Sequence, residues 1–260
     1  MDQWSYSISQ VTRTKWLILH FLASILGMLN YLQSFILIPL LYKKLFSLTE
    51  RTLPFHCYSL NVLYTCTENI EQNGLIIAYT IGIDGELTKL SSCDAGGTST
   101  CYLTIDRDQK NLLAVNYWDS TIVTIPLSPQ TGEFVGEISS KYDPKQGKGM
   151  VAAAKKNGGA NHSNNDESTI KQRQADPHSH AVVLDPYCGC IAFVPCLGKD
   201  LVREFFYDNV NGKIQQELNY LPSGLCTGHP DGPRYLEFHP KHNIMYVVNE
   251  LSSTVSQVML

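Results

Sequence analysis

The chain has 260 residues, of which 43% are hydrophobic and 17% charged, and its formal net charge is -4. A chain of this length can bury a large core as one or two ordinary domains. The slightly acidic balance offers no basic face to a nucleic acid, so we expect no nucleic-acid partner. Fourteen tyrosines, with many valines, isoleucines and threonines, favour β-strands.

The cysteines are scattered along the chain, and no pair has the CxxC spacing of redox and zinc motifs. The eight are Cys57, Cys66, Cys93, Cys101, Cys188, Cys190, Cys196 and Cys226. Several lie in apolar runs, where a reduced thiol packs as a small hydrophobic group. We therefore expect free thiols in a reducing compartment, which favours a cytoplasmic protein over a disulfide framework.

Residues 1–52 are predicted to be a hydrophobic leader. Within it, residues 16–42 are almost entirely apolar, with basic residues on both sides. A helix of about 20 apolar residues spans a bilayer, so this N-terminal hydrophobic helix predicts a membrane anchor. The basic residues at both ends leave its orientation undecided. The alternatives are an unusual buried helix, or a leader from a non-standard transcript.

From residue 53 to residue 260 the sequence repeats a β-hairpin unit. An apolar inner strand recurs four times, as NVLYTCTEN, NLLAVNYWD, CIAFVPCLG and NIMYVVNEL. These strands are centred near Tyr64, Ala114, Phe193 and Tyr246, at separations of 50, 79 and 53 residues. A period of about 40 to 50 residues with four strands in each unit is typical of a β-propeller.

Each unit continues with a third strand, and the first three units have a fourth. The third strands are predicted at 74–81, 120–127, 200–207 and 253–260, and the fourth strands at 85–93, 132–139 and 212–223. Gly85, Gly132 and Gly212 stand at corresponding turns, where glycine adopts a positive φ at little cost. The predicted fold class is all-β, a propeller of four-stranded blades.

The long separation between the second and third units is explained by an insert. Residues 141–175 are rich in Lys, Gly, Asn, Ser and Gln and contain no aromatic residue after Tyr142. Such a segment buries too little surface to offset its ordering entropy, so we predict a disordered loop. The chain stops at Leu260 inside the third strand of the fourth unit, which indicates a truncated product of a longer protein.

The chain contains the motifs QADPHSHAVVLDP, CLGKDLVREFFYD and GPRYLEFHP followed by YVVNELSSTV. These three motifs resemble the lactonase family of seven-bladed propellers, which includes a bacterial 6-phosphogluconolactonase and the fungal carboxy-muconate lactonizing enzyme. The segment NLLAVNYWDSTIVTIPL is similar to the ANYGGGSV hairpin of that family, with Trp118 and Asp119 in place of small glycines. The resemblance covers about residues 53–260 and implies that about four of seven blades are present.

The resemblance also implies three catalytic residues in the central channel. His180 begins the HAVVLD motif, Arg234 lies in GPRYLEF, and Glu250 follows in VVNELSS. Lactone hydrolysis needs a base for water and a cation for the substrate anion and the developing oxyanion. Arg234 is suited to bind a carboxylate or phosphate. His178, two residues before His180 and on the same side of an extended strand, is expected to contact the substrate.

The implied function is hydrolysis of a sugar lactone to its acid, without a cofactor, as in the pentose phosphate pathway. The partner would be the small-molecule lactone, and the protein would be a monomer if the propeller closes. A non-catalytic binding or scaffold protein and an enzyme like a muconate cycloisomerase are the alternatives.

The histidine pair could also suggest a zinc site with Cys188 and Cys190, but one residue between cysteines is too few, so we expect no metal. His239 takes the place of Asp185 in the repeat and is expected to form a turn.

Overall fold

The computed structural model describes residues 52–57, 61–144, 167–224 and 229–260. Within these ranges the chain forms antiparallel sheets, one short helix α4 (Glu167–Arg173) and a 3-10 turn at Leu197–Lys199. This confirms the prediction of an all-β, propeller-like fold. The hydrophobic segment 16–42 lies outside the described residues. In the part of the chain that is described, no helix is long and apolar enough to cross a bilayer.

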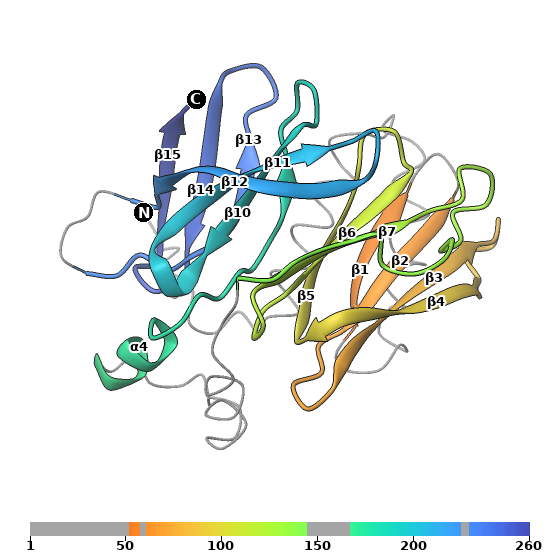
Figure 1. The fold of residues 1–260 in the computed structure, drawn as a ribbon, viewed down its shortest axis with the longest axis horizontal. Helices are drawn as coiled ribbons and strands as arrows, with labels where there is room; N and C mark the ends of the chain where they lie inside the picture. Colours follow the sequence, from red (N-terminus) through yellow and green to blue (C-terminus); the bar gives the residue numbers. More distant parts are fainter. Residues whose placement is uncertain (1–51, 58–60, 145–166, 225–228) are drawn as a thin grey trace, which may run out of the picture.

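Four sheets follow one another along the chain, and in each sheet every strand pairs with its neighbour in sequence (Figure 1). The first sheet contains β1 (Thr52–Cys57), β2 (Val62–Thr67), β3 (Asn73–Ile81) and β4 (Leu87–Thr98). The second contains β5 (Thr100–Ile105), β6 (Asn111–Asn116), β7 (Thr121–Pro126) and β8 (Ser140–Tyr142). The third contains β9 (Val183–Leu184), β10 (Ile191–Cys196), β11 (Leu201–Asp208) and β12 (Lys213–Pro222). The fourth contains β13 (Pro233–Phe238), β14 (Ile244–Asn249) and β15 (Thr254–Met259).

The turns follow from the residues that the repeat places there. Gly85, Gly132 and Gly212 have φ of 78°, 74° and 63°, which confirms the prediction of left-handed turn positions. The Asp185 carboxylate accepts the backbone N–H groups of the turn before β10, and His239 Nδ1 accepts those of Lys241 and His242 at 3.0 and 3.1 Å. His239 is thus a turn former, as predicted.

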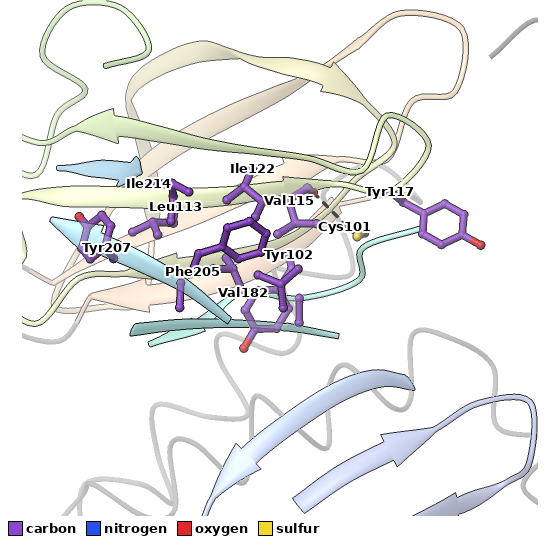
Figure 2. Packing of buried hydrophobic residues seen from close by; sticks show 13 residues of the cluster. Cys101, Tyr102, Leu113, Val115, Tyr117, Ile122, Val182, Phe205, Tyr207 and Ile214 are labelled. Atoms are coloured by element: carbon purple, nitrogen blue, oxygen red, sulfur yellow. Dashed lines mark hydrogen bonds between the residues drawn. The ribbon is translucent and has the colours of Figure 1, made fainter. Parts of the chain in front are cut away.

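The core consists of apolar side chains packed between successive sheets. Strands of the first and second sheets bury one cluster, which includes Tyr64, Ile76, Leu103, Leu112 and Val123. A second cluster joins the second and third sheets, and Figure 2 shows Tyr102, Leu113, Val115 and Phe205 meeting there. A third cluster, which includes Phe193, Val202, Leu236, Met245 and Val247, joins the third and fourth sheets. Burying each large apolar side chain contributes about 1.5–3 kcal/mol, so the sheets stabilise one another.

Two tyrosine hydroxyls fix neighbouring sheets at points where apolar contact alone would allow sliding. Tyr64 donates to the carbonyl oxygen of Gly132 at 2.6 Å, which links the first sheet to the second. Tyr207 donates to Asp106 Oδ2 at 3.0 Å and links the third sheet to the second. Both side chains are fully buried, so each hydrogen bond also satisfies a hydroxyl that would otherwise be costly.

The prediction of a disordered loop over residues 141–175 is wrong at both ends of this segment. Residues 140–142 form β8, which pairs with β7, and residues 167–173 form α4. Helix α4 leads into a segment that the third sheet holds, because Gln174 Nε2 donates to Leu197 O and Asp200 Oδ1 at 3.2 and 2.8 Å. Residues 145–166 lie outside the described residues.

The fourth strand of the second sheet also begins later than predicted. The expected strand at 132–139 makes one isolated bridge, between Phe134 and Leu127, and regular pairing with β7 begins at Ser140. Gly136 has a φ of 81°, a conformation that interrupts an extended strand. The outer strand is therefore displaced along the chain.

Gly198 lets the segment after α4 lie directly against the third sheet. A Cβ atom at this position would overlap the carbonyl oxygen of Asp176 and lie 3.3 Å from the backbone nitrogen of His178. Since both obstacles are backbone atoms, no side-chain rotation can relieve the overlap. A residue with a side chain would push residues 176–178 away from the sheet.

We therefore expect Gly198→Ala to lower the free energy of unfolding by about 1–3 kcal/mol, measured by urea denaturation. Gly82→Ala is the matched control, because its Cβ would meet the movable carboxylate of the exposed Asp84. Equal losses in the two variants would contradict the proposed close packing at Gly198.

Candidate active site

The repeat places equivalent residues of different sheets at the same end of their strands. In three sheets, the residue that follows the second strand donates its backbone N–H to the carbonyl oxygen of a residue that precedes the first strand of the same sheet. These bonds are Tyr117 to Ser99 at 2.9 Å, Leu197 to His178 at 2.9 Å and Glu250 to Gly232 at 2.7 Å. Tyr117, Leu197 and Glu250 are therefore equivalent positions.

Arg234 stands at an irregular position of its strand. In β13 it is the extra residue between the pairs Pro233–Asn249 and Tyr235–Val248, so the strand bulges there. Cys101 is the extra residue at the same point of β5. A bulge turns a side chain away from the regular alternation of the strand.

His180 is the corresponding residue of the third sheet. It follows Ser179, which bridges Cys196, and its N–H donates to the carbonyl oxygen of Pro195 at 3.1 Å. It thus lies in an extended segment before β9 and outside any named strand. The repeat therefore explains why His180 and Arg234, 54 residues apart, reach the same place.

The three residues predicted as catalytic meet in space. Arg234 Nη1 forms an ion pair with Glu250 Oε2 and lies 3.4 Å from His180 Nε2. His180 Nε2 is 3.9 Å from Glu250 Oε2. Because a guanidinium only donates, the contact with Arg234 requires a lone pair on His180 Nε2, as in the neutral imidazole. Their catalytic roles stay predictions.

Sequence reasoning missed Arg173, the last residue of α4. Its Nη2 donates to Glu250 Oε1 at 2.8 Å, so the carboxylate lies between two guanidinium groups. Burial alone would raise the pKa of Glu250, but Arg234 and Arg173 together lower it to about 2. Arg173 lay inside the segment predicted to be disordered, and its closeness along the chain to His178 was the one available signal.

Tyr117, which sequence reasoning also missed, joins the two histidines. Its ring centroid lies 4.6 Å from that of His178 and 4.4 Å from that of His180, so both imidazoles face the same side, as predicted. Figure 2 shows the Tyr117 ring directed away from the rest of its hydrophobic cluster. Trp118, at a position where similar hairpins carry glycine, contacts His178 edge-on, with 5.2 Å between the ring centroids.

His178 has a defined tautomer in this arrangement. Its Nδ1 lies 3.4 Å from the carbonyl oxygen of Tyr117, which can only accept, so Nδ1 carries the hydrogen and Nε2 keeps its lone pair. Burial lowers the pKa of His178 to about 4, although the Tyr117 carbonyl and Asp176 oppose the shift. His178 is therefore neutral at physiological pH.

The cysteine motif near the histidines takes part in a turn. Cys188 and Cys190 surround the Asp185 carboxylate, which accepts both of their backbone N–H groups. Among the residues that the structure describes, no three His, Cys, Asp or Glu side chains are grouped as metal ligands. The cysteines with described side chains are free thiols, namely Cys66, Cys93, Cys101, Cys188, Cys190 and Cys196.

Comparison with known proteins supports the fold. A family model described as "Lactonase, 7-bladed beta-propeller" matches residues 57–260. An uncharacterized protein of Staphylococcus aureus is 29% identical over 197 residues, which cover 75% of this chain and 48% of that protein. The chain thus spans about half the length of the curated relatives it matches.

Solved structures of propellers resemble this one. A candidate 6-phosphogluconolactonase of Bacteroides fragilis has a TM-score of 0.58 and 22% identity, over 80% of this chain and 52% of that one. The periplasmic gluconolactonase of Pseudomonas aeruginosa has a TM-score of 0.58 and 19% identity, over 79% of this chain and 55% of that one. At these identities the likeness supports the fold.

The first prediction from the site concerns Glu250. Because its pKa is about 2 in the folded protein and 4.5 in the unfolded chain, its ionised form stabilises the fold by up to about 3 kcal/mol above pH 4.5. This stabilisation is lost as pH falls from 4.5 towards 2. We expect Glu250→Gln to lower the free energy of unfolding at pH 7, with a difference from wild type that shrinks below pH 4.5. Urea denaturation across this range measures it, with the exposed Glu71→Gln as control.

The second prediction concerns His178, whose pKa is lowered from 6.5 to about 4. Below pH 6.5 the unfolded chain binds a proton that folded His178 does not, so wild-type stability should fall as pH drops from 6.5 to 4. His178→Asn should remove this part of the pH dependence, whereas the exposed His242→Asn should keep it. Urea denaturation between pH 7 and pH 4.5 tests this, and an unchanged slope in His178→Asn would contradict it.

Proposed function

Because the chain belongs to the lactonase family of seven-bladed β-propellers, we propose that it hydrolyses a sugar lactone to the corresponding acid. The observation that carries this proposal is the contact of Arg234 with His180 and Glu250 at one end of the sheets. The likeness to solved structures described as 6-phosphogluconolactonase and gluconolactonase candidates supports this choice of substrate class.

Arg234 is the proposed binding residue for the substrate anion and for the oxyanion of the reaction. Its side chain is 14% exposed, so most of the guanidinium is shielded from water and its field acts on a bound group with little screening. The guanidinium also lies over the Tyr235 ring, at 5.4 Å from the centroid, which restricts its orientation. Preorganised charge of this kind stabilises a developing oxyanion effectively.

His180 is the proposed proton acceptor. Glu250 is held as an anion by Arg234 and Arg173, and its lowered pKa makes it a weak base at neutral pH. The imidazole of His180, in contrast, is neutral in this arrangement because its Nε2 keeps a lone pair, and a neutral imidazole can accept a proton. His180 has no exposed surface itself, and its Nε2 faces Arg234 and Glu250, the neighbours whose side chains reach solvent.

The proposed reaction proceeds in two stages. As Arg234 Nη1 turns from His180 Nε2 to the substrate, the Nε2 lone pair becomes open to water. Water attacks the lactone carbonyl carbon as His180 takes its proton, and the carbonyl electron pair moves onto the oxygen that Arg234 stabilises. The tetrahedral intermediate then collapses, the ring C–O bond breaks, and the proton returns from His180 to the leaving ring oxygen. The product is a hydroxy acid, and each group of the protein regains its starting protonation state.

The test uses the purified chain and 6-phosphogluconolactone. We expect ring opening faster than spontaneous hydrolysis, and Arg234→Ala should reduce the excess rate about 100-fold or more. Arg107→Ala is the matched control, since Arg107 is exposed and binds the Tyr187 carbonyl at the opposite end of β5. Wild-type protein with no excess rate at any lactone concentration would sink the proposal.

The dependence of kcat on pH separates the two candidate bases. With His180 as base, the profile should have an ascending limb, and His180→Gln should remove this limb. Glu250 as base would instead give a flat profile down to about pH 3, because its pKa is about 2.

A non-catalytic binding protein is the second candidate. It is favoured by the pairing of Glu250 with two guanidiniums, since a carboxylate so held suits a static recognition site better than proton transfer. In that case the acid product should bind in an Arg234-dependent manner while the lactone hydrolyses only at its spontaneous rate. The same arginine could hold the carboxylate of a muconate, so conversion of a muconate to its lactone is measured alongside.

A further inference from the structure

Arg173 contributes a second cation to the site from outside the four sheets. It comes from the last residue of α4, whereas Glu250 follows β14 and Arg234 lies in β13. Arg173 Nη2 donates to Glu250 Oε1 at 2.8 Å, and Arg234 Nη1 donates to Glu250 Oε2. Each carboxylate oxygen is therefore paired with a different guanidinium. The Arg173 side chain is 13% exposed, which keeps this ion pair largely out of solvent.

The position of Arg173 is fixed by hydrogen bonds of the neighbouring residue. Gln174 Nε2 donates to Asp200 Oδ1 at 2.8 Å, and the same oxygen accepts the backbone N–H of Gly232 at 2.7 Å. Asp200 therefore connects the end of α4 to the residue that stands two places before Arg234. The two arginines are held relative to one another by the fold, independently of Glu250.

The groups that face Glu250 come from four segments. Arg173 and Arg234 contact its two oxygens, and His180 Nε2 lies 3.9 Å from Oε2. Tyr117 also interacts with Arg173 and Glu250. Burial raises the pKa of the Tyr117 hydroxyl, Arg173 lowers it, and Glu250 raises it further. With neutral imidazole and phenol groups, the cluster contains two positive charges and one negative charge.

The shared carboxylate determines how much positive charge Arg234 can offer to a ligand. If Glu250 were paired with Arg234 alone, the two charges would cancel and the site would have little attraction for an anion. Because Arg173 pairs with one oxygen of the Glu250 carboxylate, the cluster keeps a net positive charge next to the partly exposed guanidinium of Arg234.

We propose that Arg173 is a positioning residue that keeps Glu250 ionised and divides its charge, so that Arg234 retains positive charge for an anionic group of the substrate. The first part depends only on the contacts among these three residues. The second part rests on the proposed lactonase function, because it assumes that the substrate anion binds at Arg234.

The first experiment follows the Glu250 carboxyl carbon by NMR in protein labelled with 13C-glutamate, and the Glu250→Gln variant assigns the signal. In wild type the Glu250 signal should remain that of a carboxylate between pH 3 and pH 8. In Arg173→Gln it should titrate within this range, and in Arg173→Lys the midpoint should be lower than in Arg173→Gln. Arg107→Gln, which removes one charge at a distance, should behave as wild type. Identical Glu250 titrations in wild type and Arg173→Gln would overturn the proposal.

The second experiment measures binding of 6-phosphogluconate, the acid product of the proposed reaction, by calorimetry at pH 7. Loss of one charge-assisted contribution lowers binding affinity by about 10- to 100-fold. Arg173→Gln should therefore weaken binding by this factor, and Arg173→Lys should recover part of the affinity. Unchanged affinity in Arg173→Gln, or no binding to wild type, would overturn the second part of the proposal.

The outcomes separate this proposal from the proposed function. A wild-type chain that opens no lactone but shows the Arg173-dependent titration of Glu250 refutes lactone hydrolysis and supports the positioning role. A chain that opens lactones with an Arg173-independent titration supports hydrolysis and refutes the positioning role. Thermal unfolding of every variant identifies loss of folding, and if Arg173→Gln does not fold, the shift in Arg173→Lys decides the question.

Discussion

The structure depends on apolar packing between successive sheets. Each sheet is a small antiparallel meander that cannot bury both faces by itself, and the clusters around Leu112, Phe205 and Met245 lie where neighbouring sheets meet. This packing fixes the relative rotation of the sheets, since sliding one sheet would break the buried hydrogen bonds of Tyr64 and Tyr207. As a consequence, equivalent ends of equivalent strands are brought together, and residues far apart in sequence become neighbours.

Repetition also explains why the site is irregular. At the same point of three sheets the chain departs from regular pairing, and Cys101, His180 and Arg234 occupy that point. In the second sheet the residue is a thiol, 3.5 Å from the His180 carbonyl oxygen, whereas in the third and fourth sheets it is a group suited to chemistry. The same irregular backbone position therefore holds a packing residue in one unit and a polar residue in the next.

The sequence predicted well those features that repeat and less well those that occur once. The strand order, the left-handed glycine turns and the meeting of His180, Arg234 and Glu250 all derive from motifs with several copies or a clear resemblance. Among the residues that the structure describes, helix α4 has no counterpart in the other units, and its polar composition resembles that of a disordered loop. Composition measures how little apolar surface a segment buries, but it does not register polar side chains that bind the end of a sheet, as Gln174 does.

The same limitation applies to charge. From sequence, Glu250 could orient a partner or act as a base, since either role suits a carboxylate near a histidine. The structure narrows the choice because a second guanidinium, from Arg173, stabilises the anionic form that a base must give up. Two cations around one carboxylate favour a recognition role for Glu250, in keeping with the proposal that the neighbouring imidazole accepts the proton. A residue that contributes to the charge balance of the site therefore belongs to none of the repeated motifs.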